Sequence, residues 1–282
     1  MTQLAGGEHS SHQELAIAEP DEVRQIIRKN RYAGHTAGLC EGVLQCNLVI
    51  LPEAMAADFQ NFCEANTVFC PLLAKSRVGE FGIEALGSAI DLRTDLPLYN
   101  IHELGQPTRS MQDISSLWRD DFVAFAVGCS FTFERALLSA DIPMRHIEQD
   151  VTVPMFKTNI QTTPVGAFGG PAVVSMRPIK ESDIPKTNDI CSNYTHAHGV
   201  PIHIGNPADI GIRDINNPNW GSAVTFVDGE VPVFWGCGVT TQVAITHANP
   251  EICITHAPGA MLITQIDELS NSDWRTAGPL DE

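Results

Sequence analysis

Apolar and polar positions along the chain predict a mixture of helices and strands. Met55, Phe59, Phe62 and Cys63 recur at helical spacing after Pro52, which indicates a helix with one buried face. Another helix is expected over about 20–30, because acidic residues follow Pro20 and basic residues end the segment. Residues 45–51 form a strand-like run.

One local pattern occurs twice and predicts a strand, a tight turn and a helix. The apolar run at 122–127 leads into Gly128-Cys129-Ser130-Phe131-Thr132, and the run at 231–235 leads into Gly236-Cys237-Gly238-Val239-Thr240. The match aligns Cys129 with Cys237 and Thr132 with Thr240. Continuous apolar runs indicate strands that are buried on both faces, which favours a parallel sheet with helical crossovers.

The segment between these two copies has a different pattern of residues, which predicts a second, smaller domain. Residues 146–179 are strand-like but broken by proline and glycine, a helix is expected from 182 towards 199, and a strand at 201–204. We therefore expect an α/β fold in which a larger layered domain (20–145 and 206–270) has a mixed, partly parallel sheet. A smaller two-layer α/β domain (146–205) is inserted in it, and 1–19 and 271–282 are loose tails.

Charge and composition narrow the classes of function. Acidic residues outnumber basic ones 34 to 17, giving a net charge of −17, so nucleic acid is not an expected partner. An anionic ligand would need a local cluster of basic groups or helix N-termini. No apolar stretch approaches the roughly 20 residues that cross a bilayer, and the first residues lack a secretory pattern, so no membrane partner is expected. Eight cysteines without a C-x-x-C spacing suit free thiols in a cytoplasmic protein.

The two Gly-Cys turns are the first candidate site. The hydroxyl groups of Ser130, Thr132, Thr240 and Thr241, together with helix N–H groups, would form a site for a carboxylate or an oxyanion; plain N-capping is the alternative. Cys129 and Cys237 are either thiolates of low pKa at helix N-termini or ordinary buried thiols. If the turns end neighbouring parallel strands, they line one cleft, and Thr240→Val would reduce turnover more than stability.

Two further groups of residues offer other chemistry. Arg93 stands between Asp91 and Asp95, on one face of an extended segment, either as an exposed salt-bridge ladder or as a clamp for a substrate carboxylate. His196, His198 and His203 resemble a metal cluster. However, no H-E-x-x-H is present and the first two would lie on different faces of a helix. No metal site is therefore predicted, and solvent-facing or core-edge histidines are the simpler interpretation.

Long ordered blocks between about residues 20 and 270 resemble the D-glutamate cyclase family, whose bacterial members carry the name hydro-lyase. The blocks are 47–52 (NLVILP), 91–97 (DLRTDLP), 117–121 (LWRDD), 128–134 (GCSFTFE), 145–149 (RHIEQ), 174–178 (VSMRP), 201–207 (PIHIGNP), 231–240 (VPVFWGCGVT) and 254–259 (ITHAPG). The resemblance implies a larger layered α/β domain with a smaller α/β insertion. It also implies a hydro-lyase reaction on a small amino or hydroxy acid carboxylate, of which D-glutamate cyclisation to 5-oxo-D-proline with loss of water is the named example.

Set against that chemistry, the residues take the following expected roles. The turns at 128–132 and 236–241 would stabilise an oxyanion, and Arg93 would bind the substrate carboxylate. Asp91, His203 and His256 are the candidates for proton transfer, with Cys129 and Cys237 as further catalytic candidates. The scheme needs no organic cofactor. The sequence is compatible with a monomer or with a homo-oligomer.

The chain departs from the family pattern at three places. Ala260 follows His-Ala-Pro-Gly where a histidine is expected, Gln161-Thr162-Thr163 stands where a Pro-Cys pair is expected, and Leu98 replaces a basic residue. Ala260 and Leu98 motivate an alternative: a protein that binds a small carboxylate without turning it over. A metal-dependent hydrolase, raised by the histidines, is the third hypothesis.

Overall fold

The computed structural model describes residues 11–268. Its helices are α1 (His12–Ala16), α2 (Pro20–Arg28), α3 (Glu53–Ala65), α4 (Phe131–Ser139), α5 (Arg145–Glu148), α6 (Ile184–Cys191) and α7 (Thr240–Ala248). Its strands are β1 (Val43–Pro52), β2 (Leu72–Lys75), β3 (Tyr99–Glu103), β4 (Gln106–Met111), β5 (Phe122–Gly128), β6 (Met155–Gln161), β7 (Pro171–Lys180), β8 (His203–Ile204), β9 (Glu230–Gly236), β10 (Ile252–His256) and β11 (Leu262–Asp267). None of the described helices is long and apolar enough to cross a membrane.

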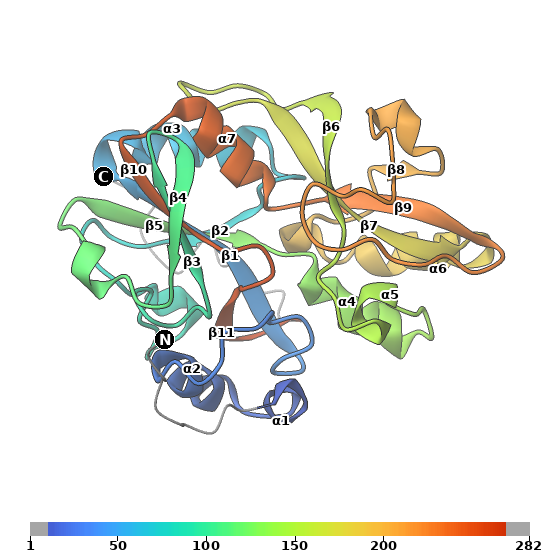
Figure 1. Cartoon of the computed structure of the whole chain (residues 1–282), viewed down its shortest axis with the longest axis horizontal. Coiled ribbons are helices and arrows are strands. Elements are labelled where there is room, and N and C mark those ends of the chain that lie inside the picture. Colours follow the sequence, from blue (N-terminus) through green and yellow to red (C-terminus); the bar gives the residue numbers. More distant parts are fainter. Residues whose placement is uncertain (1–10, 269–282) are drawn as a thin grey trace, which may run out of the picture.

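The strands form two sheets that lie side by side (Figure 1). The larger sheet has seven strands in the order β2-β5-β1-β10-β3-β4, with β11 also paired to β1. The smaller sheet has four strands in the order β6-β7-β9-β8. Strand β1 holds the larger sheet together, because it pairs with β5, β10 and β11. The mixed α/β content agrees with the sequence analysis.

The expectation of a partly parallel sheet is wrong. Every strand pair in the described part of the chain is antiparallel. The apolar run of β5 is nevertheless buried on both faces, because alternate residues serve two cores. Phe122, Ala124 and Ala126 face one core, and Val123, Phe125 and Val127 face the other. Layers on both sides of an antiparallel sheet therefore give the same sequence signature as a parallel strand.

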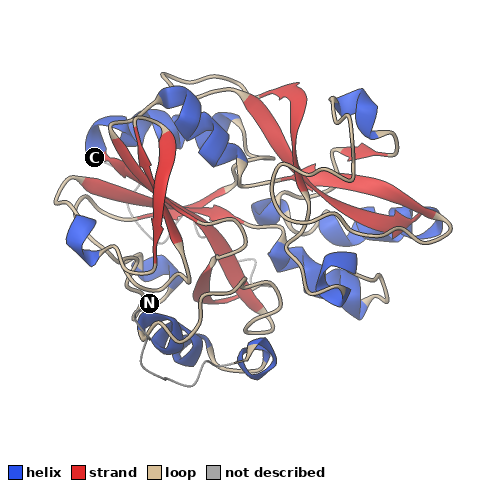
Figure 2. Ribbon diagram, viewed as in Figure 1, coloured by secondary structure: helices blue, strands red, loops and turns tan. Residues whose placement is uncertain are grey.

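Helices cover one face of each sheet (Figure 2). Phe59 and Phe62 of α3 and Ile245 of α7 pack against β1 and β5 of the larger sheet. Phe133 and Leu137 of α4 pack with residues of α6 against the smaller sheet. Helix α4 thus follows a strand of the larger sheet and packs on the smaller one, whereas α7 follows a strand of the smaller sheet and contributes to the core of the larger one.

Several local predictions can be compared with the structure. The strands and helices expected around 20–30, 45–51, 52–63, 122–134 and 231–242 are confirmed. The helix expected over 182–199 is shorter, because α6 ends at Cys191 and the chain continues through a turn of 3-10 helix at Thr195–Ala197. Strand β9 pairs with β7, so it lies in the smaller sheet, outside the range 146–205. The expected loose tail at 1–19 contains α1, whose Leu15 is buried; residues 271–282 and 1–10 lie outside the described residues.

Candidate functional site

The two Gly-Cys turns meet at one small cavity, although their strands belong to different sheets. Strand β5 ends at Gly128 and β9 ends at Gly236, and α4 and α7 begin directly after the turns. The cavity has a volume of about 20 Å³ and is lined by Asn47, Cys129, Ser130, Phe131, Val153, Met155, His198, Cys237, Gly238, Val239, His256, Gly259 and Met261. A space of this size holds about one water molecule or one substrate oxygen.

Asn47 of β1 joins the two turns. Its Nδ2 donates hydrogen bonds to the carbonyl oxygens of Gly128, at 2.6 Å, and Val127, at 3.2 Å. Its amide also occupies the space beside Gly238, where an added Cβ would lie 2.2 Å from Nδ2 and 2.6 Å from Oδ1. Glycine at 238 is therefore required by the close approach of this amide. The contact fixes the beginning of α7 against the end of β5.

Two buried histidines line the cavity as neutral imidazoles. His256 is fully buried, and its Nδ1 lies 3.2 Å from the backbone nitrogen and 3.3 Å from the oxygen of Leu48. Its Nε2 has no hydrogen-bond partner among residues 11–268. His198 places Nδ1 2.9 Å from Val68 O. Burial lowers the pKa of each histidine to about 4, so both are uncharged near neutral pH.

The cavity thiols are protonated at neutral pH. Burial raises the pKa of Cys237 to about 11, and burial raises the pKa of Cys129 as well. The backbone N–H groups of Phe131 and Val239 bond to the two sulfurs and oppose this shift, but burial outweighs them. The hypothesis of low-pKa thiolates at these turns is wrong in direction, because a helix N-terminus cannot offset full desolvation of a thiolate.

A buried ionic network lies directly behind the cavity. Arg177 of β7 is fully buried and donates from Nε to Glu134 Oε1 at 3.0 Å, with a second, shorter hydrogen bond from its terminal nitrogen. It also donates to the hydroxyl oxygens of Ser130 and Ser175, each at 3.0 Å. His146 Nε2 lies 3.1 Å from the same Glu134 oxygen. Because Ser130 lines the cavity, the network connects the positive charge of Arg177 to it.

The charges in this network act on the cavity groups. Although burial alone would raise the pKa of Glu134, the neighbouring His146 and Arg177 hold it at about 2, so the carboxylate stays ionised. The positive charge of Arg177 lowers the pKa of Cys129, Cys237 and His198, in each case as a contribution smaller than burial. At Cys129 the negative charge of Glu134 opposes Arg177 and is the larger of the two contributions, so the two residues act on this thiol as a buried ion pair.

Known proteins resemble this chain over most of its length. A family model described as D-glutamate cyclase matches residues 123–265. A protein named "Putative hydro-lyase" from Verminephrobacter eiseniae is 48% identical over 253 residues, which cover 90% of this chain and 92% of the relative. One of the same name from Dinoroseobacter shibae is 50% identical over 262 residues, covering 93% and 87%. The chain belongs to the D-glutamate cyclase family.

The nitrogen repressor-like protein MJ0159 from Methanococcus jannaschii aligns with a TM-score of 0.36 and 11% sequence identity, over 77% of this chain and 86% of that protein.

In this member of the D-glutamate cyclase family, the four nominated hydroxyl residues have different surroundings. Ser130 lines the cavity, whereas Thr132, Thr240 and Thr241 are buried without lining it. Thr240 Oγ1 accepts a hydrogen bond from Val173 N at 3.0 Å and lies 3.3 Å from Val173 O, and Thr241 Oγ1 donates to Gly238 O at 2.7 Å. These two hydroxyl groups are bonded to backbone atoms. Among residues 11–268, no side-chain hydroxyl forms an N-cap hydrogen bond at α4 or α7.

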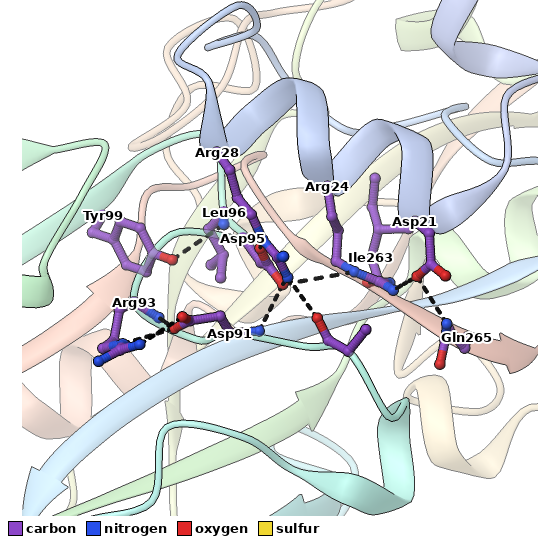
Figure 3. A network of polar contacts seen from close by, with 11 residues as sticks. Asp21, Arg24, Arg28, Asp91, Arg93, Asp95, Leu96, Tyr99, Ile263 and Gln265 are labelled. Carbon is purple, nitrogen blue, oxygen red and sulfur yellow. Dashed lines mark hydrogen bonds and ion pairs between the residues drawn. The ribbon is translucent and has the colours of Figure 1, made fainter.

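The acidic and basic residues at 91–95 form a separate structural cluster (Figure 3). Arg93 bonds twice to Asp91, at 2.9 and 2.7 Å, and its guanidinium lies 3.6 Å from the centroid of the Phe81 ring. The expected extended segment is a turn, in which the N–H groups of Thr94 and Asp95 bond to Asp91 O. Asp95 is buried against Arg28 and Arg24 of α2. Neither Asp91 nor Arg93 lines the cavity.

The remaining histidine candidates are dispersed. His203 lies on the short strand β8 at the edge of the smaller sheet, with Nε2 2.8 Å from Asn206 O, and it does not line the cavity. His198 does line it, whereas His196 belongs to the preceding turn of 3-10 helix. Within residues 11–268, no group of three or more histidine, cysteine, aspartate or glutamate side chains is arranged to hold a metal ion.

The family resemblance contained signals for residues that the candidate list missed. Glu134, His146 and Arg177 stand in three separate blocks that resemble the family, 128–134, 145–149 and 174–178, and the fold brings these blocks together behind the cavity. Asn47 begins another such block, at 47–52. Polar residues that stand within otherwise apolar family blocks are therefore the sequence signal from which these four residues could have been predicted.

The three departures from the family pattern have different positions relative to the site. Ala260 is buried between Gly259 and Met261, both of which line the cavity. Leu98 accepts a hydrogen bond from Ala257 N, in the same loop that follows β10. Thr162 bonds through its hydroxyl to Gly170 O, at the end of the β6–β7 connection. The substitution at 260 is therefore the one that touches the cavity wall.

Proposed function

We propose that the chain is a hydro-lyase-type enzyme that acts on a small amino or hydroxy acid carboxylate. D-Glutamate cyclisation to 5-oxo-D-proline is the first candidate reaction, in keeping with the family and with the name of the relatives. The observation that carries the proposal is the cavity itself. It brings the neutral His256, with an unpartnered Nε2, close to Ser130, whose hydroxyl is held by Arg177, in a space for one oxygen.

The reaction balances with these groups. The ammonium group of the substrate first passes one proton to the distal carboxylate, which gives a neutral amine and a carboxylic acid. The amine nitrogen attacks the carboxyl carbon and a C–N bond forms; the nitrogen loses a second proton, and the C–O bond breaks as the departing hydroxyl gains that proton and leaves as water. His256, in the tautomer whose Nδ1–H donates to Leu48 O, would accept the second proton on Nε2 and return it to the departing hydroxyl. The cavity would hold that oxygen. The first turns of α4 and α7, which both begin at the cavity, would stabilise the negative charge that develops on the carboxyl group.

Arg177 takes the electrostatic role that sequence alone suggested for Arg93. Arg93 is committed to Asp91 and to the Phe81 ring. Arg177 acts through Ser130 at the cavity wall, and Glu134 holds its guanidinium in place. We therefore assign oxyanion stabilisation to the turn at 128–132, as expected from the sequence, and assign the cationic role to Arg177 of β7 in place of Arg93.

The direct test is incubation of the purified protein with D-glutamate, followed by chromatography for 5-oxoproline, and then with a panel of small hydroxy acids. His256→Gln should lower kcat/KM by about 100-fold or more, because general acid–base groups contribute 10²–10⁴. His247→Gln is the matched control: this exposed histidine of α7 lies outside the cavity and should leave turnover unchanged. Absence of turnover on every compound would reject the proposal.

Ala260 favours a second candidate function, in which the protein binds a small carboxylate without turning it over. The residue is buried between two lining positions, Gly259 and Met261, and alanine offers no polar side chain next to the cavity wall. Thermal-shift measurements separate the candidates. Strong stabilisation by carboxylates with no product formed would favour binding alone.

A further inference from the structure

A second buried histidine, His198, lines the same cavity as His256 and takes no part in the proton transfer assigned to His256. The two rings come from different parts of the fold. His198 follows the turn of 3-10 helix at Thr195–Ala197, and His256 ends β10 of the larger sheet. His198 is 3% exposed and His256 is 0% exposed, and Nε2 of each ring has no hydrogen-bond partner among residues 11–268. The cavity therefore has two unpartnered ring nitrogens at its wall.

The hydrogen bonds of the two Nδ1 atoms determine what the Nε2 atoms can bind. His198 Nδ1 lies 2.9 Å from Val68 O, and a carbonyl oxygen only accepts, so this Nδ1 carries the proton. His256 has the same arrangement in the tautomer whose Nδ1–H donates to Leu48 O, at 3.3 Å. Burial lowers the pKa of both rings to about 4, although the carbonyl groups of Val68 and Gly128 oppose this shift at His198. A neutral imidazole has one N–H, so both Nε2 atoms are hydrogen-bond acceptors at neutral pH.

The backbone holds His198 at the cavity in a conformation that a side-chain-bearing residue rarely adopts. Its φ is +82°, in the left-handed region where glycine is the usual residue. The glycines of both Gly-Cys turns leave room for the surrounding chain. An added Cβ at Gly128 would overlap His196 O, and one at Gly236 would overlap Val68 O and lie 3.4 Å from His198 Nδ1. A strained backbone that presents a side chain in place of glycine is typical of functional positions.

Two acceptors at one small space select a group by the hydrogens that it carries. A carboxylate oxygen has none and would place its lone pairs against those of both Nε2 atoms, which disfavours it. The hydroxyl group of a carboxylic acid has one hydrogen to donate, and water has two. The cavity, of about 20 Å³, therefore suits the departing oxygen better with each proton that this oxygen gains. Binding that improves along a reaction lowers its barrier.

We propose that His198 is a second catalytic residue, which accepts a hydrogen bond from the hydroxyl of the reacting carboxyl group while His256 delivers the proton that converts this hydroxyl into water. The inference rests on the proposed function. The bond to His198 Nε2 directs the hydroxyl hydrogen away from His256, so an oxygen lone pair faces the proton on His256 Nε2. The C–O bond breaks with its electron pair on oxygen, and the water then donates one hydrogen to each imidazole. His198 itself gains and loses no proton.

Paired substitutions separate a hydrogen-bond acceptor from a proton-transfer group. His198→Leu has no acceptor and should lower kcat with D-glutamate by about 10-fold or more, because the hydroxyl is left without its partner. His198→Gln keeps an amide donor for Val68 O and an acceptor oxygen for the hydroxyl, so it should be at least about fivefold more active than His198→Leu. At His256 the same two replacements should be equally damaging, because neither leucine nor glutamine transfers a proton.

His102→Leu is the matched control for the loss of a buried histidine. His102 is 2% exposed, and its Nε2 lies 3.0 Å from Thr255 Oγ1, but it does not line the cavity. Burial lowers its pKa to about 4, as at His198. The His102→Leu variant should therefore lose stability as His198→Leu does and keep the wild-type kcat. Equal kcat values for His198→Leu and His198→Gln would overturn the acceptor role.

A second measurement uses the wild-type protein and covers the case in which a variant does not fold. D-Glutamine carries a carboxamide in place of the reacting carboxyl group, so it presents an N–H where the acid presents its hydroxyl. In protein labelled with ¹⁵N-histidine, free His198 should carry its proton on Nδ1, and D-glutamine should shift its Nε2 signal towards that of a hydrogen-bonded nitrogen. The signals of His102 should not respond. A proton on Nε2 of free His198, or an Nε2 signal that D-glutamine leaves unchanged, would overturn the inference.

The outcomes distinguish this inference from the proposed function. Turnover that is lost in His256→Gln and unchanged in His198→Leu would overturn the inference and leave the proposed function intact. Absence of product from every compound, combined with the Nε2 shift of His198 on addition of D-glutamine, would reject the proposed function and support His198 as the hydrogen-bond acceptor of the cavity.

Discussion

At the scale of single residues, Thr240 shows how surroundings decide the role of a hydroxyl group. Its Oγ1 is buried and bonded to the backbone of Val173, so it joins the beginning of α7 to β7. Thr240→Val should destabilise the protein by about 1–3 kcal/mol, because a buried backbone group loses its partner. Activity per folded molecule should be retained. The sequence-based expectation was the opposite, with turnover affected more than stability.

Urea unfolding and steady-state kinetics on the same preparation test this prediction. Thr246→Val is the matched control in the same helix, since Thr246 is exposed and its hydroxyl donates to Gln242 O. It should change the unfolding free energy by less than about 0.5 kcal/mol. Normal stability of Thr240→Val combined with lost turnover would restore a catalytic role for the hydroxyl.

Glu134 gives the sharpest residue-scale prediction about stability. It is buried with Arg177 and His146, and removal of its charge leaves the Arg177 guanidinium without a carboxylate. Glu134→Gln should cost about 3–5 kcal/mol of unfolding free energy, as for other broken buried ion pairs. Glu148→Gln, which breaks an exposed pair with Arg145, should cost about 1 kcal/mol or less. Equal unfolding midpoints in denaturant for the two variants would contradict the buried-network interpretation.

At the scale of elements, the close contact between Asn47 and Gly238 sets the position of α7. Gly238→Ala places a methyl group where the Asn47 amide lies, so either the amide or the helix start must move. We expect kcat/KM to fall by about 100-fold, a loss typical of a displacement of about 1 Å near a reacting group. Gly169→Ala is the control, because its nearest neighbour to an added Cβ is 3.4 Å away. Wild-type kinetics for Gly238→Ala would show that Asn47 does not position the site.

The elements themselves were largely predictable from sequence, but their pairing was not. The repeated strand–turn–helix order at 122–134 and 231–242 is present as β5–α4 and β9–α7. The runs do not pair in one sheet, because β5 pairs with β1 and β2 whereas β9 pairs with β7 and β8. An apolar run records burial on both faces and contains no information on the direction of its neighbour. The turns nevertheless meet, because each strand ends at the junction of the two sheets.

The candidate site could be predicted only in its local parts. Cys129, Ser130, Cys237 and His256 were nominated from sequence and line the cavity. Asn47 was missed because its partner Gly128 is 81 positions away, so no local pattern connects them. Arg177 lies in an apolar strand and bonds to Glu134, 43 positions earlier. Polar residues whose partners are distant in sequence become interpretable only with the fold.

At the scale of the whole molecule, buried histidines predict sensitivity to acid. Burial lowers the pKa of His102, His198 and His256 to about 4, below the ordinary value of about 6.5. At these histidines the unfolded chain binds more protons than the folded one between these values, so each of them lowers stability as pH decreases from about 6.5 to about 4, whereas Glu268, whose pKa is raised by burial to about 7, acts in the opposite direction. Each histidine contributes up to about 1.4 kcal/mol per pH unit in that window.

Unfolding free energies at several pH values test this prediction. The slope against pH between about 4 and 6.5 should be smaller in His256→Gln than in the wild type, because the contribution of one buried histidine is gone. The exposed His247→Gln variant should keep the wild-type slope. Identical slopes in all three proteins would contradict neutral burial of His256.

The central position of β1 has a consequence for how the protein can be divided. The family match begins at residue 123, after β1, yet β1 pairs with β5, β10 and β11 and carries Asn47. A gene fragment cut at 123 would leave those three strands with unpaired N–H and C=O groups, a template for aggregation. The segment that can be transplanted as a folded unit therefore reaches back at least to Val43, and recombination between relatives inside 43–123 can separate β1 and its Asn47 from the rest of the cavity wall.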